Sequence, residues 1–430
     1  MTPSARCSLD RFAIEAIQLE KLQLLLTTVL SRNPFYSAKL QRAGVSAAIA
    51  SLAEFVAAVP FTDKSEIVDD QSKYPPFGSN LSYPLERYTR FHQTSGTTGT
   101  PVRWLDTPES WEWMVDCWTR VYQSAHTLPQ DRVFFPFSFG PFLGFWVAFD
   151  AATRMGCLSI SGGNMRSAAR LRAILDSGVT VLCSTPSYAV HLAEIAAEEK
   201  IDLRKGKVHT IIAAGEPGGS IPATRALIER LWSGARVVDH HGMTEVGPVT
   251  YECPERCGIL HIIEDGYFAE VVDPVSLESV QPGATGELVL TNLGRLGSPL
   301  LRYRTGDIVR RSQDGPCGCG SAELSLDGGI LGRCDDMVIV RGVNLYPSAV
   351  EEILRSCGVL EFRVQTSQHC GLAEMSIQIE PDPSCSDTAI FAKRVAVTLH
   401  NALGFRVHVS YVPYGTLPRF EGKGNRWIRG

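Results

Sequence analysis

The 430-residue sequence lacks a long uninterrupted hydrophobic run. Its most apolar stretch, residues 134–148, contains two prolines and two glycines and is too short and too interrupted to span a bilayer. The first residues carry charged and polar side chains where a secretion signal has an apolar segment. We therefore expect a cytoplasmic protein that does not cross a membrane.

Clusters of basic residues are also missing. The formal net charge is −5, the pI is about 6.1, and Lys and Arg are dispersed along the chain, so no nucleic-acid partner is expected. Twelve cysteines are too few for a disulfide scaffold in a chain of this length, and most should be reduced. With 44% apolar and 20% charged residues, the composition is that of a globular protein, and the length predicts at least two domains.

The hydrophobic pattern changes along the chain. Residues 14–43 have apolar positions at helical spacing, and Asn33-Pro34 interrupts that pattern. Residues 132–242 alternate short β-branched runs with helix-like stretches, which predicts a layered α/β domain with parallel strands. Residues 258–309 are denser in strands and turns and predict a β-rich subdomain.

A further change follows Arg333 and predicts a domain boundary. The remaining residues follow the order strand, helix, two strands, helix, strand. This order fits a small two-layer α+β domain of about 100 residues. We therefore predict an N-terminal domain of residues 1–333 and a C-terminal domain of residues 334–430.

The sharpest local motif is TSGTTGTP at residues 94–101. Glycines allow the backbone to approach phosphate oxygens closely, while amides and hydroxyls donate hydrogen bonds. The motif is not a Walker loop, because it lacks the Lys that such a loop requires. Taken alone, it is equally compatible with a polar surface turn. The phosphate-binding candidates are Thr94, Ser95, Gly96, Thr97, Thr98 and Gly99.

Other motifs accompany this loop in a fixed order. They are NPFYSAKL at 33–40, AAGEP at 213–217, HHGMTEVG at 240–247, LLRYRTGDIV at 300–309, GRCDDMVIVRGVNLYPSAVEEI at 332–353 and EGKGNR at 421–426. With these motifs the sequence resembles, essentially from end to end, the adenylate-forming superfamily and in particular its phenylacetate-CoA ligase branch. The resemblance implies a large α/β domain with a β-rich subdomain and a small hinged C-terminal domain. It also implies a ligase that activates an aromatic carboxylic acid with ATP and then forms a coenzyme A thioester.

The resemblance assigns nucleotide-binding roles. Thr244 would contact the α-phosphate, and Glu245 would hold Mg²⁺, for which a carboxylate oxygen is suited. Asp307 would accept hydrogen bonds from both ribose hydroxyls, and Arg333 would support the ribose or the phosphates. The adenine pocket would be lined by Gly215, Glu216, Pro217, His241, Gly242 and Met243.

Lys423, in EGKGNR, is the residue that the resemblance assigns to the first half-reaction. A cation between the carboxylate and ATP lowers the barrier of an attack that brings two anions together. The C-terminal domain would rotate about Asp335, first placing Lys423 and then presenting the strand with Gly342 to a pantetheine thiol. That thiol is expected to be coenzyme A, although a carrier-protein phosphopantetheine would use the same chemistry.

Two residues depart from the family pattern. Thr100 stands in the phosphate loop where phenylacetate-CoA ligases often have lysine, which removes a charge. His241 stands where an aromatic residue, commonly tyrosine, precedes the glycine of the adenine motif. An imidazole can still stack on a purine, but it buries less surface and it can titrate.

A group of cysteines and one histidine has the composition of a metal site. Cys253, Cys257 and His261 lie within nine residues, and Cys317 and Cys319 follow later in the chain. Thiolates and an imidazole suit a tetrahedral structural zinc ion, although the spacing matches no standard zinc finger and reduced surface thiols are the alternative. Because related ligases have comparable elements, we expect Cys253, His261, Cys317 and Cys319 as ligands, with Cys257 as the substitute.

The acid pocket is the least determined part of the sequence. The segment FFPFSFGPFLGFW supplies Phe135, Phe137 and Phe142, which are sufficient to line an aryl-sized slot. Core packing is the more common reason for such a run. Tyr188 and Ala214 are further candidates for the same pocket.

A different class of function is a non-catalytic nucleotide-binding protein that keeps the fold. The presence of Glu245, Asp307 and Lys423 favours the enzyme. The sequence leaves open which acid is used and whether the chain forms a homodimer.

Overall fold

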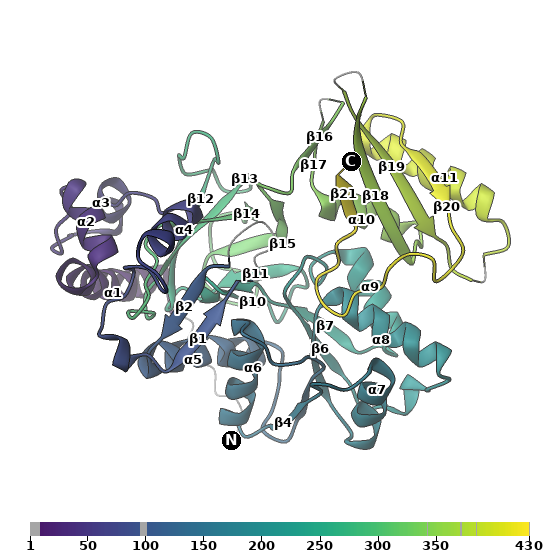
Figure 1. The fold of residues 1–430 in the computed structure, drawn as a ribbon, viewed down its shortest axis with the longest axis horizontal. Helices are drawn as coiled ribbons and strands as arrows, with labels where there is room; N and C mark the ends of the chain where they lie inside the picture. Colours follow the sequence, from purple (N-terminus) through teal and green to yellow (C-terminus); the bar gives the residue numbers. More distant parts are fainter. Residues whose placement is uncertain (1–8, 95–100, 342, 370–371, 384, 430) are drawn as a thin grey trace.

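The computed structural model describes residues 9–94, 101–341, 343–369, 372–383 and 385–429, and Figure 1 shows their arrangement. Four helices form one end of the molecule. They are α1 (Arg11–Arg32), α2 (Pro34–Arg42), α3 (Leu52–Ala58) and α4 (Lys64–Lys73). Asn33 ends α1 and caps α2, since its side chain accepts a hydrogen bond from the amide of Tyr36. The predicted break at Asn33-Pro34 is therefore confirmed.

A five-stranded parallel sheet forms the centre of the molecule, with strand order β4-β3-β5-β6-β7. Helices cover both of its faces, with α5 and α6 on one face and α7, α8 and α9 on the other. This arrangement confirms the predicted layered α/β domain. The strands are β3 (Arg132–Phe135), β4 (Leu158–Ser161), β5 (Val181–Ser184), β6 (Thr210–Ala213) and β7 (Arg236–Asp239). The helices are α5 (Pro108–Ser124), α6 (Leu143–Arg154), α7 (Ser167–Asp176), α8 (Pro186–Glu198) and α9 (Pro222–Leu231).

A six-stranded antiparallel sheet follows, in the order β10-β11-β15-β14-β13-β12. It confirms the predicted β-rich subdomain. Its strands are β10 (Thr250–Glu252), β11 (Ile259–Ile262), β12 (Tyr267–Val272), β13 (Thr285–Asn292), β14 (Tyr303–Arg311) and β15 (Ser325–Arg333). Two small hairpins lie beside it, formed by β1 (Arg90–Gln93) with β2 (Arg103–Asp106) and by β8 (Gly242–Met243) with β9 (Gly247–Pro248).

The C-terminal part contains a four-stranded sheet of order β20-β19-β18-β21, covered by two helices. Its elements are β16 (Val338–Val340), β17 (Val343–Leu345), α10 (Pro347–Ser356), β18 (Glu361–His369), β19 (Leu372–Glu380), α11 (Thr388–Leu403), β20 (His408–Tyr411) and β21 (Trp427–Arg429). The predicted first strand is instead a separate hairpin, β16 with β17. The sheet gains β21, which pairs with β18 and is too short to produce a hydrophobic period.

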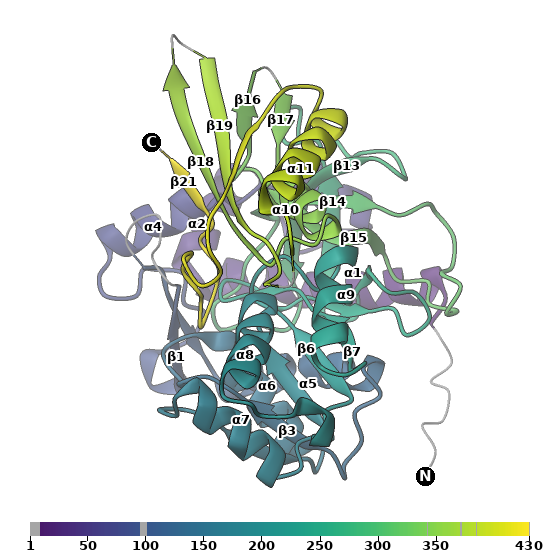
Figure 2. The ribbon, with the colours of Figure 1, turned by 90° about the vertical axis from the view of Figure 1, so that its right-hand side faces the viewer.

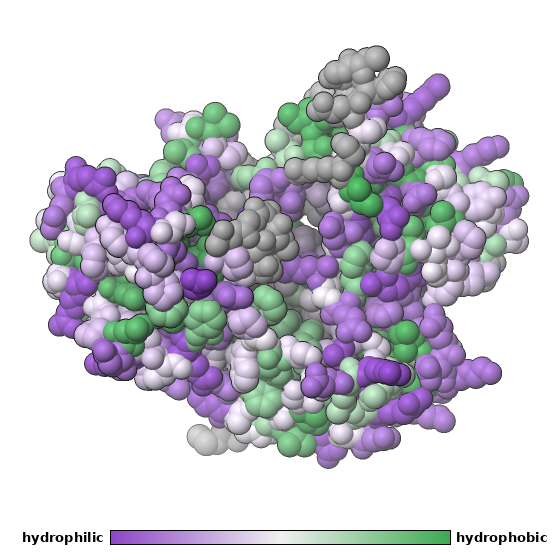
Figure 3. Space-filling view, viewed as in Figure 1, coloured by the Kyte–Doolittle hydropathy of each residue, from purple (hydrophilic) through white to green (hydrophobic). Residues whose placement is uncertain are grey.

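Figures 1 and 2 place this C-terminal part above α8 and α9 of the central layer. In the space-filling view, the surface is hollowed between the C-terminal part, at upper right, and the N-terminal helices, at left (Figure 3). Among the described helices, none combines the length and the hydropathy that a membrane crossing needs.

Candidate active site

The predicted nucleotide-binding residues follow two neighbouring strands of the parallel sheet. Residues 214–217 come directly after β6, and residues 240–245 come directly after β7. The carboxyl ends of parallel strands lie at one edge of a sheet, and that edge is where open α/β sheets bind ligands. The fold therefore brings AAGEP and HHGMTEVG together, although 22 residues separate Pro217 from His240 in the sequence.

Asp307 joins this edge from β14 and lies beside a histidine and an arginine. One carboxylate oxygen accepts a hydrogen bond from Arg333 Nη1 at 2.9 Å, and the other lies 3.1 Å from His241 Nε2. Burial raises the pKa of Asp307, but His241 and Arg333 outweigh burial and hold it below its usual value. The carboxylate is therefore ionised at neutral pH, as a two-oxygen acceptor for a ribose must be.

Glu245 has a buried side chain that faces a cation. Its Oε1 lies 3.1 Å from Nζ of Lys64, at the start of α4. Mg²⁺ binds through one or two carboxylates together with substrate phosphates, and Glu245 supplies one carboxylate, which Lys64 neutralises here. Lys64 was not predicted, because it stands in a polar helix with no motif around it.

Arg295 and Asp106 were also missed by the sequence analysis, and both are completely buried. The guanidinium holds the carboxylate through two hydrogen bonds, from Nε at 2.7 Å and from Nη2 at 2.8 Å. Its Nη1 donates to the carbonyl oxygens of Thr244, at 2.9 Å, and Glu245, at 2.7 Å. Neither residue stands in a distinctive local pattern, because Asp106 lies in RWLDTP and Arg295 in NLGRLGS.

Asp106 ends β2, and the β1–β2 hairpin carries the phosphate motif between its strands. Thr94 closes the hairpin, since its hydroxyl accepts the amide of Val102 at 3.0 Å. The Arg295–Asp106 pair therefore connects the hairpin of the phosphate motif to the Thr244-Glu245 turn. The other predicted phosphate residues, Ser95, Gly96, Thr97, Thr98 and Gly99, lie outside the described residues, as do Thr100 and Gly342.

The segment that contains Lys423 reaches the same edge of the sheet. Gly422 accepts a hydrogen bond from the hydroxyl of Thr185, and Gly424 donates its amide to Glu216. Lys423 itself is exposed between these two contacts. Asp335 lies next to the predicted nucleotide-binding residue Arg333. Its carboxylate accepts a hydrogen bond from Arg333 Nε at 2.8 Å.

The aromatic candidates for the acid pocket are divided between the two faces of the parallel sheet. Phe135 is buried in the core on the α5–α6 face, Phe137 stacks on Phe145 at 3.6 Å, and Phe142 is 47% exposed. Tyr188 is completely buried in the core on the α7–α9 face. Because α5–α6 and α7–α9 cover opposite faces of the sheet, Phe135 and Tyr188 belong to different hydrophobic cores.

The hydroxyl of Tyr188 forms hydrogen bonds with Ser167 and Arg170. Ala214, in contrast, is partly exposed at the edge of the sheet, directly after β6.

The four predicted zinc ligands form a compact group. The candidate ligand atoms of Cys253, His261, Cys317 and Cys319 all lie within 4.8 Å of one another, and Cys257 is exposed outside the group. Cys253 Sγ is 3.7 Å from Cys317 Sγ, and Cys319 Sγ is 3.5 Å from His261 Nε2. Around one tetrahedral zinc ion, the sulfur–sulfur and sulfur–nitrogen distances would be about 3.8 and 3.6 Å.

The protonation state of His261 also fits a metal ligand. Burial lowers its pKa to about 4, so the imidazole is neutral at physiological pH. A neutral ring nitrogen has the free electron pair that coordination requires.

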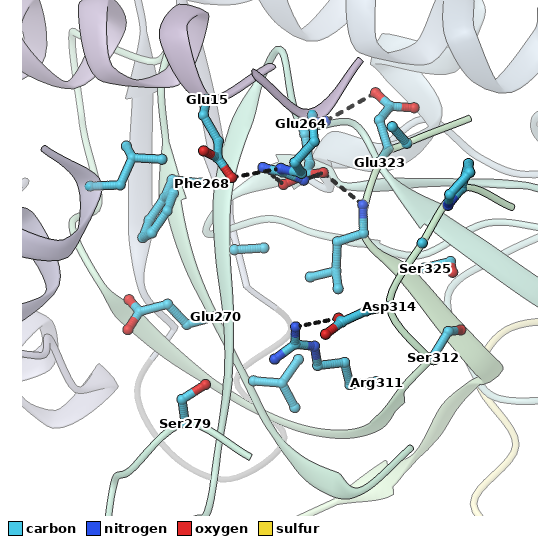
Figure 4. Close-up of a pocket in the computed structure, with 18 of the residues that line it drawn as sticks. Glu15, Glu264, Phe268, Glu270, Ser279, Arg311, Ser312, Asp314, Glu323 and Ser325 are labelled. Atoms are coloured by element: carbon cyan, nitrogen blue, oxygen red, sulfur yellow. Dashed lines mark hydrogen bonds and ion pairs between the residues drawn. The ribbon is translucent and has the colours of Figure 1, made fainter. Parts of the chain in front are cut away.

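A cavity of about 1020 Å³ lies elsewhere, between α1, α3 and the six-stranded sheet (Figure 4). None of the predicted catalytic or nucleotide-binding residues that the structure describes lines it. Several of its charged side chains are already paired, including Arg311 with Asp314 and Arg11 with Glu264. We therefore place the candidate active site at the edge of the parallel sheet.

Comparisons with known proteins agree with this fold. The family described as "AMP-binding enzyme" matches residues 91–294, and the family described as "AMP-binding enzyme C-terminal domain" matches residues 342–429. The fold and the site thus define an AMP-binding enzyme with both of its characteristic parts.

Two relatives narrow this class. The chain is 31% identical to the phenylacetate-coenzyme A ligase of Thermus thermophilus, over 96% of each chain. It is 30% identical to the phenylacetate-coenzyme A ligase of Escherichia coli, over 99% of this chain and 96% of that one. The chain therefore belongs to the adenylate-forming AMP-binding enzymes, in their phenylacetate-CoA ligase branch.

Solved structures of one relative, 2-hydroxyisobutyryl-CoA ligase, are known in two different states. The postadenylation state with 2-HIB-AMP has a TM-score of 0.93 at 27% identity, covering 98% of this chain and 91% of that one. The thioesterification state with 2-HIB-AMP and CoA has a TM-score of 0.74 at 28% identity and the same coverage. The present structure is therefore arranged like the postadenylation state.

Proposed function

We propose that this chain is an ATP-dependent acid–thiol ligase. It converts a carboxylic acid and ATP to an acyl-AMP and pyrophosphate, and then converts the acyl-AMP and coenzyme A to a thioester and AMP. The observation that carries this proposal is that Asp307, Glu245 and the segment of Lys423 meet at one edge of the parallel sheet. Relatives that share 30% or more of the sequence carry the name of this activity.

The first half-reaction follows from the charges at this edge. Asp307 accepts hydrogen bonds from the ribose hydroxyls, while Thr244 contacts the α-phosphate. Lys423 lies between the carboxylate and the α-phosphate and stabilises the negative charge that develops during the attack. Bound Mg²⁺ would neutralise phosphate charge, and Glu245 is the residue that would hold it.

The second half-reaction requires a different arrangement of the two domains, for which we propose the bounds 1–333 and 334–430. Rotation about Asp335 withdraws Lys423 and brings the strand with Gly342 to the acyl-AMP. The pantetheine thiol then attacks the acyl carbon and displaces AMP. Coenzyme A is our first choice of thiol, and a carrier-protein pantetheine and a homodimer remain predictions.

We also propose that Cys253, His261, Cys317 and Cys319 hold one structural zinc ion. This proposal is supported by their mutual distances and by the neutral His261. The ion would join the turn between β14 and β15 to β11. We propose a cytoplasmic location, where ATP and coenzyme A are available and thiols stay reduced.

The acid is proposed to be aromatic, because Phe137 and Phe142 are partly exposed beside the sheet edge. The test incubates the protein with ATP, hydroxylamine and a panel of aryl acids and short 2-hydroxy acids. We expect hydroxamate to form fastest with an aryl acid. Pyrophosphate release measures the same step independently. Retained ATP binding without turnover of any acid would favour the non-catalytic nucleotide-binding protein.

A further inference from the structure

The segment of Lys423 is fixed on both sides of the lysine. On one side, the hydroxyl of Thr185 donates to the carbonyl oxygen of Gly422 at 3.3 Å. On the other side, the amide of Gly424 donates to Glu216 Oε2 at 2.6 Å. The main chain around Lys423 is therefore held at two points, while the lysine side chain between them is free to point elsewhere.

Glu216 is well placed to bind this segment. Its second oxygen, Oε1, accepts the amide of Ser187 at 2.7 Å, in the first turn of α8. The positive end of a helix dipole stabilises a carboxylate at this position. Burial raises the pKa of Glu216, while Arg426 and the two amides that its carboxyl group accepts oppose this rise. One carboxyl group thus joins the start of α8, in the N-terminal domain, to Gly424, in the C-terminal domain.

Gly424 has a steric reason to be glycine. A Cβ atom at this position would lie 2.5 Å from Arg426 Nη1 and 2.9 Å from Ser187 Oγ. Arg426 Nη1 donates to Ser187 Oγ at 3.0 Å, while Nε and Nη2 of the same guanidinium donate to Glu361. Any larger residue would therefore push the segment away from Glu216.

These contacts belong to one arrangement of the two domains. Residues 185, 187 and 216 precede the proposed boundary, and residues 422–424 follow it. The whole chain matches the postadenylation state of 2-hydroxyisobutyryl-CoA ligase with a TM-score of 0.93 and its thioesterification state with 0.74. A rotation between such states would separate Glu216 from Gly424.

We propose that Glu216, assisted by Thr185, is a positioning residue that docks residues 422–424 and so places Lys423 for adenylation alone. This inference rests on the proposed ligase function. It differs from the role in the adenine pocket that the sequence suggested for Glu216, because docking uses both carboxylate oxygens for main-chain amides. Docking affects the placement of Lys423, whereas a pocket role affects the binding of ATP.

The test measures the two half-reactions separately in Glu216→Gln and Gly424→Ala. The side-chain NH₂ group of glutamine would face one of the two main-chain N–H groups that Glu216 accepts, so two hydrogen-bond donors would meet. We expect the kcat of adenylation to fall about tenfold to a hundredfold in both variants, the usual effect of losing a charged hydrogen bond. Thioester formation from synthetic acyl-AMP should stay within about twofold of the wild-type rate.

Glu229→Gln is the matched control. Glu229 is another partly buried carboxylate of the α/β layer that accepts a main-chain amide, from Val237 at 3.1 Å. Among the described residues of the C-terminal part, none forms a hydrogen bond or ion pair with Glu229, and both half-reactions should be unchanged in this variant. The double variant Glu216→Gln/Gly424→Ala should be no slower than the slower single variant, because both changes break the same contact.

Several outcomes would overturn the docking role. They are equal loss of both half-reactions in Glu216→Gln, an increase in the KM for ATP at unchanged kcat, and normal adenylation in Gly424→Ala. Gly424 lies outside the hydrophobic cores, so its variant tests the proposal even where Glu216→Gln folds poorly. A wild-type protein without adenylation activity would contradict the proposed function instead, which keeps the two failures distinguishable.

Discussion

Asp106 and Arg295 are fully buried charges that lie directly beneath the main chain of Thr244 and Glu245. A buried ion pair is weak evidence for stability as such, because desolvation opposes the attraction. Here each nitrogen of the guanidinium has a partner, either the carboxylate or a carbonyl oxygen. We infer that the pair fixes the turn that carries Thr244 and Glu245.

Replacing Asp106 by Asn should destabilise the fold by about 3–5 kcal/mol, because it leaves the buried guanidinium without its counter-charge. Chemical denaturation followed by fluorescence measures this change. The matched control is Asp314→Asn, which removes the exposed Arg311–Asp314 pair and should cost about 0–1 kcal/mol. Equal effects of the two variants would contradict the role of the buried pair.

The same substitution has an expected pH dependence. Burial raises the pKa of Asp106, but Arg295 and His92 outweigh burial and lower it below the value of an unfolded chain. A depressed pKa stabilises the fold above the unfolded value, about 3.9, and this stabilisation is lost as the pH falls through the folded value. The acid loss of stability below about pH 4 should therefore be shallower in Asp106→Asn.

Lys423 provides a further prediction at the scale of a residue. Lys423→Ala should lower the rate of adenylation by about 100-fold to 1000-fold, the usual effect of losing one group that stabilises the transition-state charge. Thioester formation from synthetic acyl-AMP should remain, since that step does not use the lysine. Lys393→Ala, an exposed lysine of α11 in the same domain, is the control. Equal damage to both half-reactions would refute the assignment.

At the scale of elements, the proposed zinc site joins three separate segments of the β-rich subdomain. Cys253 follows β10, His261 belongs to β11, and Cys317 and Cys319 lie between β14 and β15. A metal ion bound to all three segments would stabilise the folded state, because its ligands come together only when the chain is folded. Its chemistry is structural, because all four ligand positions are filled by protein side chains.

Elemental analysis of the purified protein should therefore find about one equivalent of zinc. Cys317→Ser should lose the metal and lower the thermal midpoint, because the turn between β14 and β15 is no longer held. Cys257→Ser should keep the metal and the thermal midpoint, since Cys257 is exposed and lies outside the group of four candidate ligands. A folded wild-type protein without metal would dismiss the site.

Secondary-structure elements also show where the hydrophobic pattern was insufficient. The run FFPFSFGPFLGFW and Tyr188 were assigned to one pocket, yet neighbouring residues of β3 belong to different cores. Periodicity reports which residues are apolar, but the choice of face depends on which helices cover each side of the sheet. Similarly, the three residues of β21 are a strand only because β18 offers them a free edge.

At the scale of the whole molecule, the proposed reaction needs two arrangements of the same two domains. Several ion pairs and hydrogen bonds cross between them here, including Arg170 with Glu421 and Arg419 with Glu194. Each of these contacts contributes little free energy compared with a hydrophobic core, so a rotation of the domains can exchange one set of contacts for another. The hinge is the proposed control point of this exchange.

Restricting the hinge should affect the two half-reactions differently. Asp335→Pro fixes φ at the proposed hinge, so thioester formation should slow by about tenfold or more, while adenylation continues in the present arrangement. The control is Asp335→Ala, which removes the side chain but leaves the backbone free. Stopped-flow assays of each half-reaction give the comparison, and unimpaired thioester formation in the proline variant would place the hinge elsewhere.

The sequence by itself determined the order of elements, the family and the identity of the residues in the motifs. Those features are local: a helix period, a glycine-rich loop or a Thr-Glu pair can be read from adjacent residues. The four proposed zinc ligands were predicted from residue type together with the family resemblance, because thiolates and imidazoles are the usual ligands of structural zinc.

Only the tertiary structure decided which distant residues meet. Lys64 reached Glu245, Arg295 reached Asp106, and Glu216 reached Gly424 through contacts between residues 181, 189 and 208 positions apart. No local pattern marks such pairs, because their proximity results from how sheets and helices pack. The residues of the motifs were therefore predictable, whereas the buried ion pair and the docking contacts that position them were not.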